Sequence, residues 1–88
     1  MARADDLVLY HYDGCFYCGR VERVLSDLGV EVEHRDILEN PGYMRELIDA
    51  RGLKTVPVLR IRGAEGDEWL PESRQIVSYL KSRFARPA

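Results

Sequence analysis

Apolar and polar positions follow first a strand-like and then a helix-like period along the amino-terminal half of the chain. Residues 7–10 form a continuous apolar run, which is typical of a strand buried on both faces of a sheet. Between residues 16 and 28 the apolar positions recur at i, i+3, i+4 and i+7, and Gly29 is suited to cap the resulting helix. Residues 30–35 alternate, which predicts a strand with one wet face.

The carboxy-terminal half predicts a helix, a hairpin and a final helix. Asn40 and Pro41 suit the N-cap and the first position of a helix that Gly52 would end. Residues 56–61 and 68–70 are predicted strands, and the turn-forming residues 63–67 between them favour a hairpin. The last helix is expected to open at residues 71–73, with an apolar face made of Ile76, Val77, Leu80 and Phe84.

This order of elements, βαβαββα, predicts an α/β fold. Because a β-helix-β connection is almost always right-handed, the first two strands should be parallel neighbours. The hairpin would complete a four-stranded mixed sheet with helices on both faces. No repeat or linker interrupts the chain, so residues 1–88 are expected to form a single domain.

Composition narrows the range of partners. The net charge of −2 supplies no cationic surface for phosphate backbones, so no nucleic acid is expected as a partner. No apolar run approaches the roughly 18 residues of a membrane span. The first residues lack the apolar stretch of a secretory signal. We therefore expect a cytoplasmic protein with no membrane association.

The two cysteines, Cys15 and Cys18, carry the clearest chemical signal. They lie between the first strand and the first helix, with Cys15 at the helix N-terminus and Cys18 one turn inside. This spacing suits reversible disulfide exchange, since Cys15 can attack and Cys18 can displace the resulting mixed disulfide. The free N–H groups and the dipole of the helix end favour a thiolate there.

Two other interpretations of this pair are open. It could be half of a zinc site, but the remaining ligand candidates, His11 and His34, have no regular spacing to it. It could also be two merely buried thiols. The position of the motif directly after a strand favours redox chemistry, and no metal is expected.

At this point the sequence resembles the glutaredoxin family and, similarly, the thioredoxin-like N-terminal domain of glutathione transferases. The resemblance rests on the motif from Tyr10 to Cys18, on Thr55-Val56-Pro57 about forty residues later, and on Glu72-Ser73 at the start of the last helix. It covers nearly the whole chain, from about Leu7 to Phe84, and it implies a thioredoxin-like fold.

Residue by residue, the resemblance implies a nucleophile, Cys15, and a resolving thiol, Cys18. It implies that Pro57 is a cis-proline and that Val56 presents its backbone to the cysteinyl part of glutathione. Glutathione, as co-substrate, would also meet residues Tyr17, Lys54, Thr55, Glu72 and Ser73: Lys54 at its glycyl carboxylate, and the pair Glu72 and Ser73 at its γ-glutamyl group.

Plainer alternatives accompany these roles. Pro57 could be a trans proline on an edge strand, and Lys54 could be a solvated lysine. Ser73 could be only a helix cap, with Glu72 an acidic residue of the first turn. Arg20 is expected on a solvated helix face, although it could lie near a bound anion.

The sequence also departs from the glutaredoxin pattern. Phe16 stands where dithiol glutaredoxins usually have proline, and Tyr12 where many of them have lysine. Leu70-Pro71 replaces a Gly-Gly turn, which brings this detail closer to the transferase domains. Because the sequence ends at Ala88, before any helical second domain, transferase activity is not expected.

The function that the resemblance implies is glutathione-dependent thiol-disulfide oxidoreduction. The expected enzyme reduces protein–glutathione mixed disulfides and small disulfides, and its partners are glutathione and disulfide-containing or glutathionylated proteins. We expect a monomer. The alternatives are an iron–sulfur cluster-binding module, in which Cys15 and glutathione hold the cluster, and an electron donor recharged by thioredoxin reductase.

Overall fold

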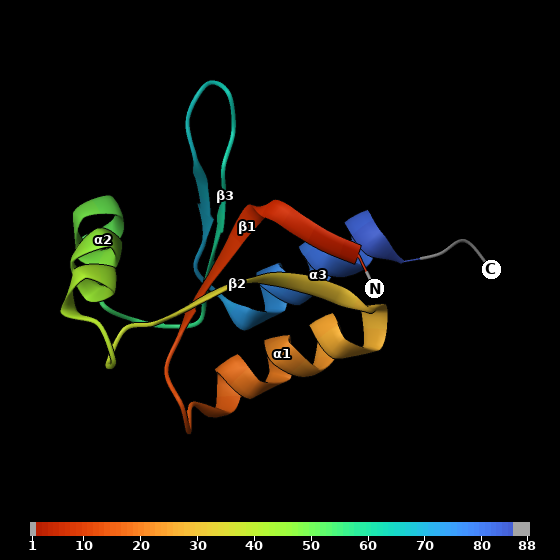
Figure 1. Ribbon diagram of the computed structural model, residues 1–88, viewed down its shortest axis with the longest axis horizontal. Coiled ribbons are helices and arrows are strands. Elements are labelled where there is room, and N and C mark those ends of the chain that lie inside the picture. Colours follow the sequence, from red (N-terminus) through yellow and green to blue (C-terminus); the bar gives the residue numbers. More distant parts are fainter. Residues whose placement is uncertain (1, 86–88) are drawn as a thin grey trace.

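The computed structural model describes residues 2–85, and Figure 1 shows their arrangement. Four strands and three helices follow one another in the predicted order. They are β1 (Ala2–His11), α1 (Phe16–Leu28), β2 (Val30–Asp36), α2 (Pro41–Arg51), β3 (Val58–Ile61), β4 (Glu68–Leu70) and α3 (Ser73–Phe84).

The strands form one mixed sheet in the order β2-β1-β3-β4. β1 runs parallel to β2, and the last paired positions are His11 and Asp36. β1 is antiparallel to β3, with Leu9 opposite Leu59, and β3 is antiparallel to β4. The mixed sheet and the hairpin expected from the sequence are therefore confirmed. The loop of this hairpin projects away from the helices in Figure 1.

Helices cover both faces of the sheet, as the sequence predicts. α1 and α3 lie together on one face and α2 lies on the other (Figure 1). The side chains of β1 alternate accordingly. Leu7 and Leu9 are fully buried with the residues of α1 and α3, whereas Val8 and Tyr10 are fully buried on the side of α2. The period of two within an apolar strand thus divides the core into two layers.

Local signals fix the helix ends where they were expected. Gly29 and Gly52 both adopt left-handed backbone conformations, with φ of 68° and 72°, at the C-caps of α1 and α2. The Asn40 side chain accepts a hydrogen bond of 2.9 Å from the backbone N–H of Gly42, which caps α2.

Two strand boundaries differ from the prediction. β1 begins at Ala2 rather than Leu7, because Ala2 and Arg3 pair with the start of β2 ahead of a register shift between Arg3 and Val8. β3 begins at Val58 rather than Val56, so the segment around Pro57 lies outside the ladder. Pro57 has no N–H to donate to a neighbouring strand.

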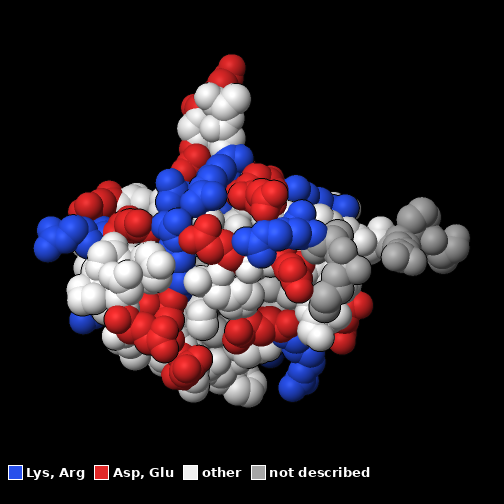
Figure 2. Space-filling view, in the orientation of Figure 1, with Lys and Arg blue, Asp and Glu red and all other residues white. Residues whose placement is uncertain are grey.

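Charged side chains are interspersed around the base of the hairpin, as Figure 2 shows for the face drawn. Arg60 contacts Asp67 at 2.7 Å, and Arg62 lies 3.8 Å from Glu33. No helix in residues 2–85 is both long and apolar enough to cross a membrane.

Candidate functional site

The loop between β1 and α1 places the two thiols at the beginning of the helix. Gly14 has a φ of 89°, a conformation that side chains disfavour, and it turns the chain into Cys15. Cys15 is the N-cap of α1 with extended backbone angles, and its own N–H donates to the carbonyl of Tyr12 at 3.3 Å. The Sγ atom of Cys15 accepts a hydrogen bond of 3.3 Å from the backbone N–H of Cys18.

The two thiols have different environments. Cys15 is partly exposed, whereas Cys18 is fully buried. Burial, and after it the hydrogen bond with Cys15, raises the pKa of the Cys18 thiol to about 12. Cys18 is therefore a neutral thiol at physiological pH, and Cys15 is the sulfur that an external reactant can reach. This arrangement suits an attacking and a resolving thiol.

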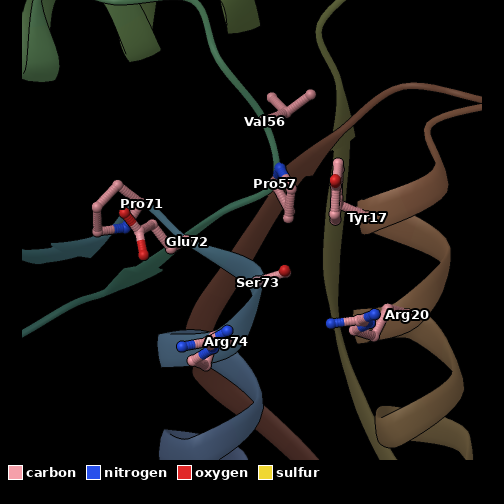
Figure 3. Close-up of a pocket in the computed structure, with 8 residues that line it drawn as sticks. All are labelled: Tyr17, Arg20, Val56, Pro57, Pro71, Glu72, Ser73 and Arg74. Carbon is pink, nitrogen blue, oxygen red and sulfur yellow. The ribbon is translucent and has the colours of Figure 1, made fainter.

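A cavity of about 420 Å³ lies beside this helix end, between α1, α3 and the loop before β3. Figure 3 shows its lining, which comes from all three segments: Tyr17, Arg20, Val56, Pro57, Pro71, Glu72, Ser73 and Arg74. Five of the residues that the resemblance assigned to glutathione, namely Tyr17, Val56, Pro57, Glu72 and Ser73, thus line one cavity. They come from three separate parts of the sequence.

The amino-terminal end of α3 forms one wall of this cavity. Glu72 is the N-cap of α3, but no side chain caps the helix. The first N–H groups of α3 are therefore left for a ligand or for water, and such a helix end attracts anions. In Figure 3 the Ser73 hydroxyl and the Arg20 side chain both project into the space between α3 and α1.

The Val56–Pro57 peptide bond is cis, which agrees with the expectation for Pro57. Pro57 is buried and Val56 is partly buried, and the two lie across the cavity from Glu72 (Figure 3). The neighbouring residues Lys54 and Thr55 are exposed and do not line the cavity. The structure therefore brings Val56 and Pro57 to the cavity and leaves Lys54 and Thr55 outside its lining.

Sequence reasoning missed part of this cavity. No role was predicted for Arg74. Arg20 was expected on a solvated helix face or near a bound anion, and its side chain is exposed. Both line the cavity and give it positive charge beside the end of α3. The sequence positions of both residues were the only local indication of such a role. Arg20 follows Cys18 by two residues on the same helix, and Arg74 directly follows Ser73.

A second cavity, of about 520 Å³, opens at Cys15 itself. It runs along α1, and its lining includes Cys15, Phe16, Arg20 and Arg23. Phe16 is 74% exposed and its ring meets that of Tyr17 edge-on, with the ring centroids 5.4 Å apart. Since Arg20 lines both cavities, the thiol and the first cavity belong to one continuous surface.

Comparison with known proteins defines the family. Residues 9–88 match the family described as "Glutathione S-transferase, N-terminal domain". The chain belongs to this family of glutathione S-transferase N-terminal domains. A search of curated proteins found no match.

Solved structures agree with this assignment. The trimeric glutathione transferase TDR1 of Leishmania shares 26% identity at a TM-score of 0.74, covering 90% of this chain and 18% of that one. A maleylacetoacetate isomerase from Anaeromyxobacter dehalogenans 2CP-1, solved with glutathione in its active site, shares 26% identity at a TM-score of 0.70, covering 93% and 39%. Glutathione transferase Omega 2S from Trametes versicolor is similar in fold, with 20% identity, a TM-score of 0.75 and coverage of 97% and 41%.

These similarities confirm the thioredoxin-like fold and the transferase half of the resemblance. The relatives named are glutathione transferases and an isomerase, so the family is that of the transferase domains and not specifically that of glutaredoxins. The chain spans between 18% and 41% of the length of these three relatives.

Proposed function

We propose that this domain is part of a glutathione-using enzyme and that it catalyses glutathione-dependent thiol-disulfide exchange. The observation that carries the proposal is the pair of thiols at the start of α1. The Cys15 thiol is partly exposed, and its Sγ atom accepts a hydrogen bond from the backbone N–H of Cys18. The Cys18 side chain is buried, one helical turn further on. A thiol of this kind beside a cavity with an anion-attracting helix end suits a substrate that carries both a sulfur and carboxylates.

The cavity chemistry matches the γ-glutamyl end of glutathione. Its carboxylate would accept hydrogen bonds from the uncapped N–H groups of α3 and from Ser73, with Arg20 supplying positive charge. The Glu72 carboxylate would meet the ammonium of the same group. The backbone of Val56 would bind the cysteinyl part of glutathione. This contact would direct the glutathione sulfur towards Cys15. Lys54 is proposed at the glycyl carboxylate and Thr55 as a further contact of glutathione, at the edge of the cavity rather than in its lining.

The reaction proceeds by two exchanges. The Cys15 thiolate attacks the glutathionyl sulfur of a protein–glutathione disulfide, which forms a Cys15–glutathione disulfide and releases the protein thiolate, to be protonated by solvent. A second glutathione thiolate then attacks the glutathionyl sulfur, which releases glutathione disulfide and restores the Cys15 thiolate. Overall, one protein–glutathione mixed disulfide and one glutathione give one protein thiol and one glutathione disulfide.

Cys18 offers another route for the second exchange. Its sulfur can attack Sγ of Cys15, which releases glutathione and leaves a Cys15–Cys18 disulfide. Because the Cys18 thiol is neutral at physiological pH, it must lose its proton as it attacks. This requirement favours glutathione as the usual resolving thiol.

The family match favours a second candidate, glutathione transfer or isomerisation. The relatives with 26% identity are a glutathione transferase and a maleylacetoacetate isomerase. In such a reaction glutathione would bind in the same cavity, but its sulfur would attack an electrophilic carbon instead of a disulfide. The two candidates thus share a ligand and differ in whether Cys15 forms a covalent bond.

Two assays on the same preparation distinguish these candidates. Reduction of hydroxyethyl disulfide is coupled to glutathione reductase and NADPH, and conjugation of glutathione to 1-chloro-2,4-dinitrobenzene is followed by absorbance. The proposal expects disulfide reduction that depends on Cys15. Conjugation with no disulfide reduction would overturn the oxidoreductase proposal in favour of the transferase. Replacing glutathione reductase by thioredoxin reductase tests which reductant recharges the protein.

Substrates, oligomeric state and location complete the proposal. We propose glutathionylated or disulfide-containing proteins as substrates, and a monomeric cytoplasmic protein. The absorbance spectrum of protein purified without oxygen tests whether an iron–sulfur cluster is bound. The sedimentation coefficient, measured with and without glutathione, tests whether the protein is a monomer.

A further inference from the structure

Three potential metal ligands meet at one end of the sheet, outside the glutathione cavity. His11 ends β1 and Asp36 ends β2, and the two are paired positions of these parallel strands. Asp13 follows in the loop that leads to Cys15. A ring nitrogen of His11 and one carboxylate oxygen each from Asp13 and Asp36 lie within 4.8 Å of one another.

The His11 side chain lacks a partner for one nitrogen. His11 is only 8% exposed, and its Nδ1 atom is buried with no hydrogen-bond partner among residues 2–85. Buried polar atoms are nearly always satisfied by a protein group, a water molecule or an ion, so this nitrogen beside two carboxylates has room for such a partner. Neutral imidazole is the commonest protein ligand for transition metals.

The Asp36 carboxylate is held in position for such a role. Its Oδ1 atom accepts hydrogen bonds from the backbone N–H groups of Leu38 at 2.8 Å and Glu39 at 3.2 Å. These two bonds fix the orientation of the Asp36 carboxylate. Outer hydrogen bonds of this kind orient the ligands of metal sites.

We propose that His11, Asp13 and Asp36 form a binding site for a divalent transition-metal ion such as Zn²⁺. One imidazole and two carboxylates are a donor set that Zn²⁺ accepts, and three protein ligands leave a fourth position for water. The imidazole disfavours Mg²⁺ and Ca²⁺, which prefer oxygen ligands. Asp13 is exposed, so the ion can enter from solvent, and it would fix the loop two residues before Cys15.

His34 lies close by and serves as a matched control. Its ring meets that of His11 edge-on, with the centroids 5.2 Å apart. However, its Nδ1 lies 3.0 Å from the carbonyl of Val32 and its Nε2 lies 3.5 Å from Glu22. Both nitrogens of His34 therefore have partners already, and removing this ring should leave the metal site intact.

The test is titration calorimetry with Zn²⁺ alone, in buffer free of glutathione, on the Cys15→Ser protein. This background removes the accessible thiol, and buried Cys18 is not available as a ligand. We expect one Zn²⁺ per chain. Adding Asp13→Asn should weaken binding about tenfold or more, since even outer partners of metal ligands are worth 10–100-fold. His11→Gln should abolish binding, and His34→Gln should leave it unchanged.

Three results would overturn the site: no saturable binding, equal affinity in Asp13→Asn, or equal losses in His34→Gln and His11→Gln. Asp13 is exposed, so Asp13→Asn keeps the test decisive even where His11→Gln does not fold. Circular dichroism of each variant shows which proteins are folded. The outcome is independent of whether the protein reduces disulfides.

Discussion

The backbone N–H of Cys18 points at the Sγ atom of Cys15, 3.3 Å away. This contact joins the two cysteines, whose environments differ. It also fixes the Sγ atom of Cys15 at the beginning of α1, on the partly exposed side of the pair. The same helical turn carries the Cys18 side chain into the interior, where it stays protonated.

Alkylation should therefore distinguish the two thiols. We expect iodoacetamide to modify the native reduced protein at Cys15 alone between pH 7 and pH 9, because burial raises the pKa of Cys18 to about 12. Peptide mass spectrometry reports the modified residue. The same protein in guanidinium chloride should take up two equivalents. Labelling of Cys18 in the native protein would show that this thiol is accessible.

Activity should depend on the two cysteines unequally. In the hydroxyethyl disulfide assay, Cys15→Ser should abolish activity, because serine cannot form the mixed disulfide. Cys18→Ser should retain substantial activity, since a second glutathione can resolve the intermediate. Trapping of a glutathione adduct on the Cys18→Ser protein, seen by intact mass, checks the mechanism. Activity that survived in Cys15→Ser would assign the nucleophile elsewhere.

Replacing both Glu72 and Ser73 by alanine should weaken the binding of glutathione much more than it destabilises the fold. No side chain caps α3, so the free energy of unfolding should change by only about 0.5 kcal/mol. Loss of charge-assisted hydrogen bonds to glutathione should cost about 1.5–3 kcal/mol of binding, seen as a raised KM for glutathione.

Ser78→Ala is the matched control for that experiment, because Ser78 is exposed on α3 and does not line the cavity. Its KM for glutathione should equal that of the wild type. If the double variant had an unchanged KM per folded molecule, the two residues would have no part in binding glutathione.

Tyr10 should contribute to stability through its hydroxyl. This group donates to Oε1 of Glu46 at 2.8 Å and accepts from Nη1 of Arg60 at 3.2 Å, beneath α2. Tyr10→Phe leaves both charged groups without this partner and should destabilise the protein by about 1.5–3 kcal/mol in urea unfolding. The control is Tyr43→Phe, which retains the ring under Arg35. Equal stability of the two variants would contradict this account.

Asp6 should make stability depend on pH. Its carboxylate accepts two hydrogen bonds from Arg83, at 2.8 and 2.9 Å, which join β1 to α3 and hold the pKa of Asp6 below its usual 3.8. Because the pKa is lower in the folded state, this stabilisation is present above pH 3.8 and is lost as the pH falls through the lowered value.

The comparison that isolates this effect is urea unfolding of wild type and Asp6→Asn at pH 7 and pH 3. The pair is partly exposed, so we expect a difference of about 0.5–1 kcal/mol at pH 7 and a smaller one at pH 3. Asp5→Asn, at a side chain 85% exposed, should show a smaller difference at pH 7. A difference for Asp6→Asn that stays constant with pH would exclude ionisation of this carboxyl as its cause.

The sequence alone determined the elements and their order. Continuous apolar residues at 7–10, the helical spacing after Cys15 and the glycines at 29 and 52 are local signals, and local backbone preferences act on neighbouring residues. The mixed sheet then followed from chain connectivity, because right-handed crossovers leave few alternatives. The two thiols were identifiable for the same reason, since their spacing is within one turn of a helix.

Only the tertiary structure decided which distant residues meet. It brought Tyr17, Val56 and Ser73 to one cavity, added Arg20 and Arg74 to it, and left Lys54 and Thr55 outside the lining. It also left α3 without a side-chain cap, and it placed His11 and Asp36 side by side at the strand ends. Such contacts depend on how sheet and helices pack across the chain, and no local period along the sequence encodes that packing.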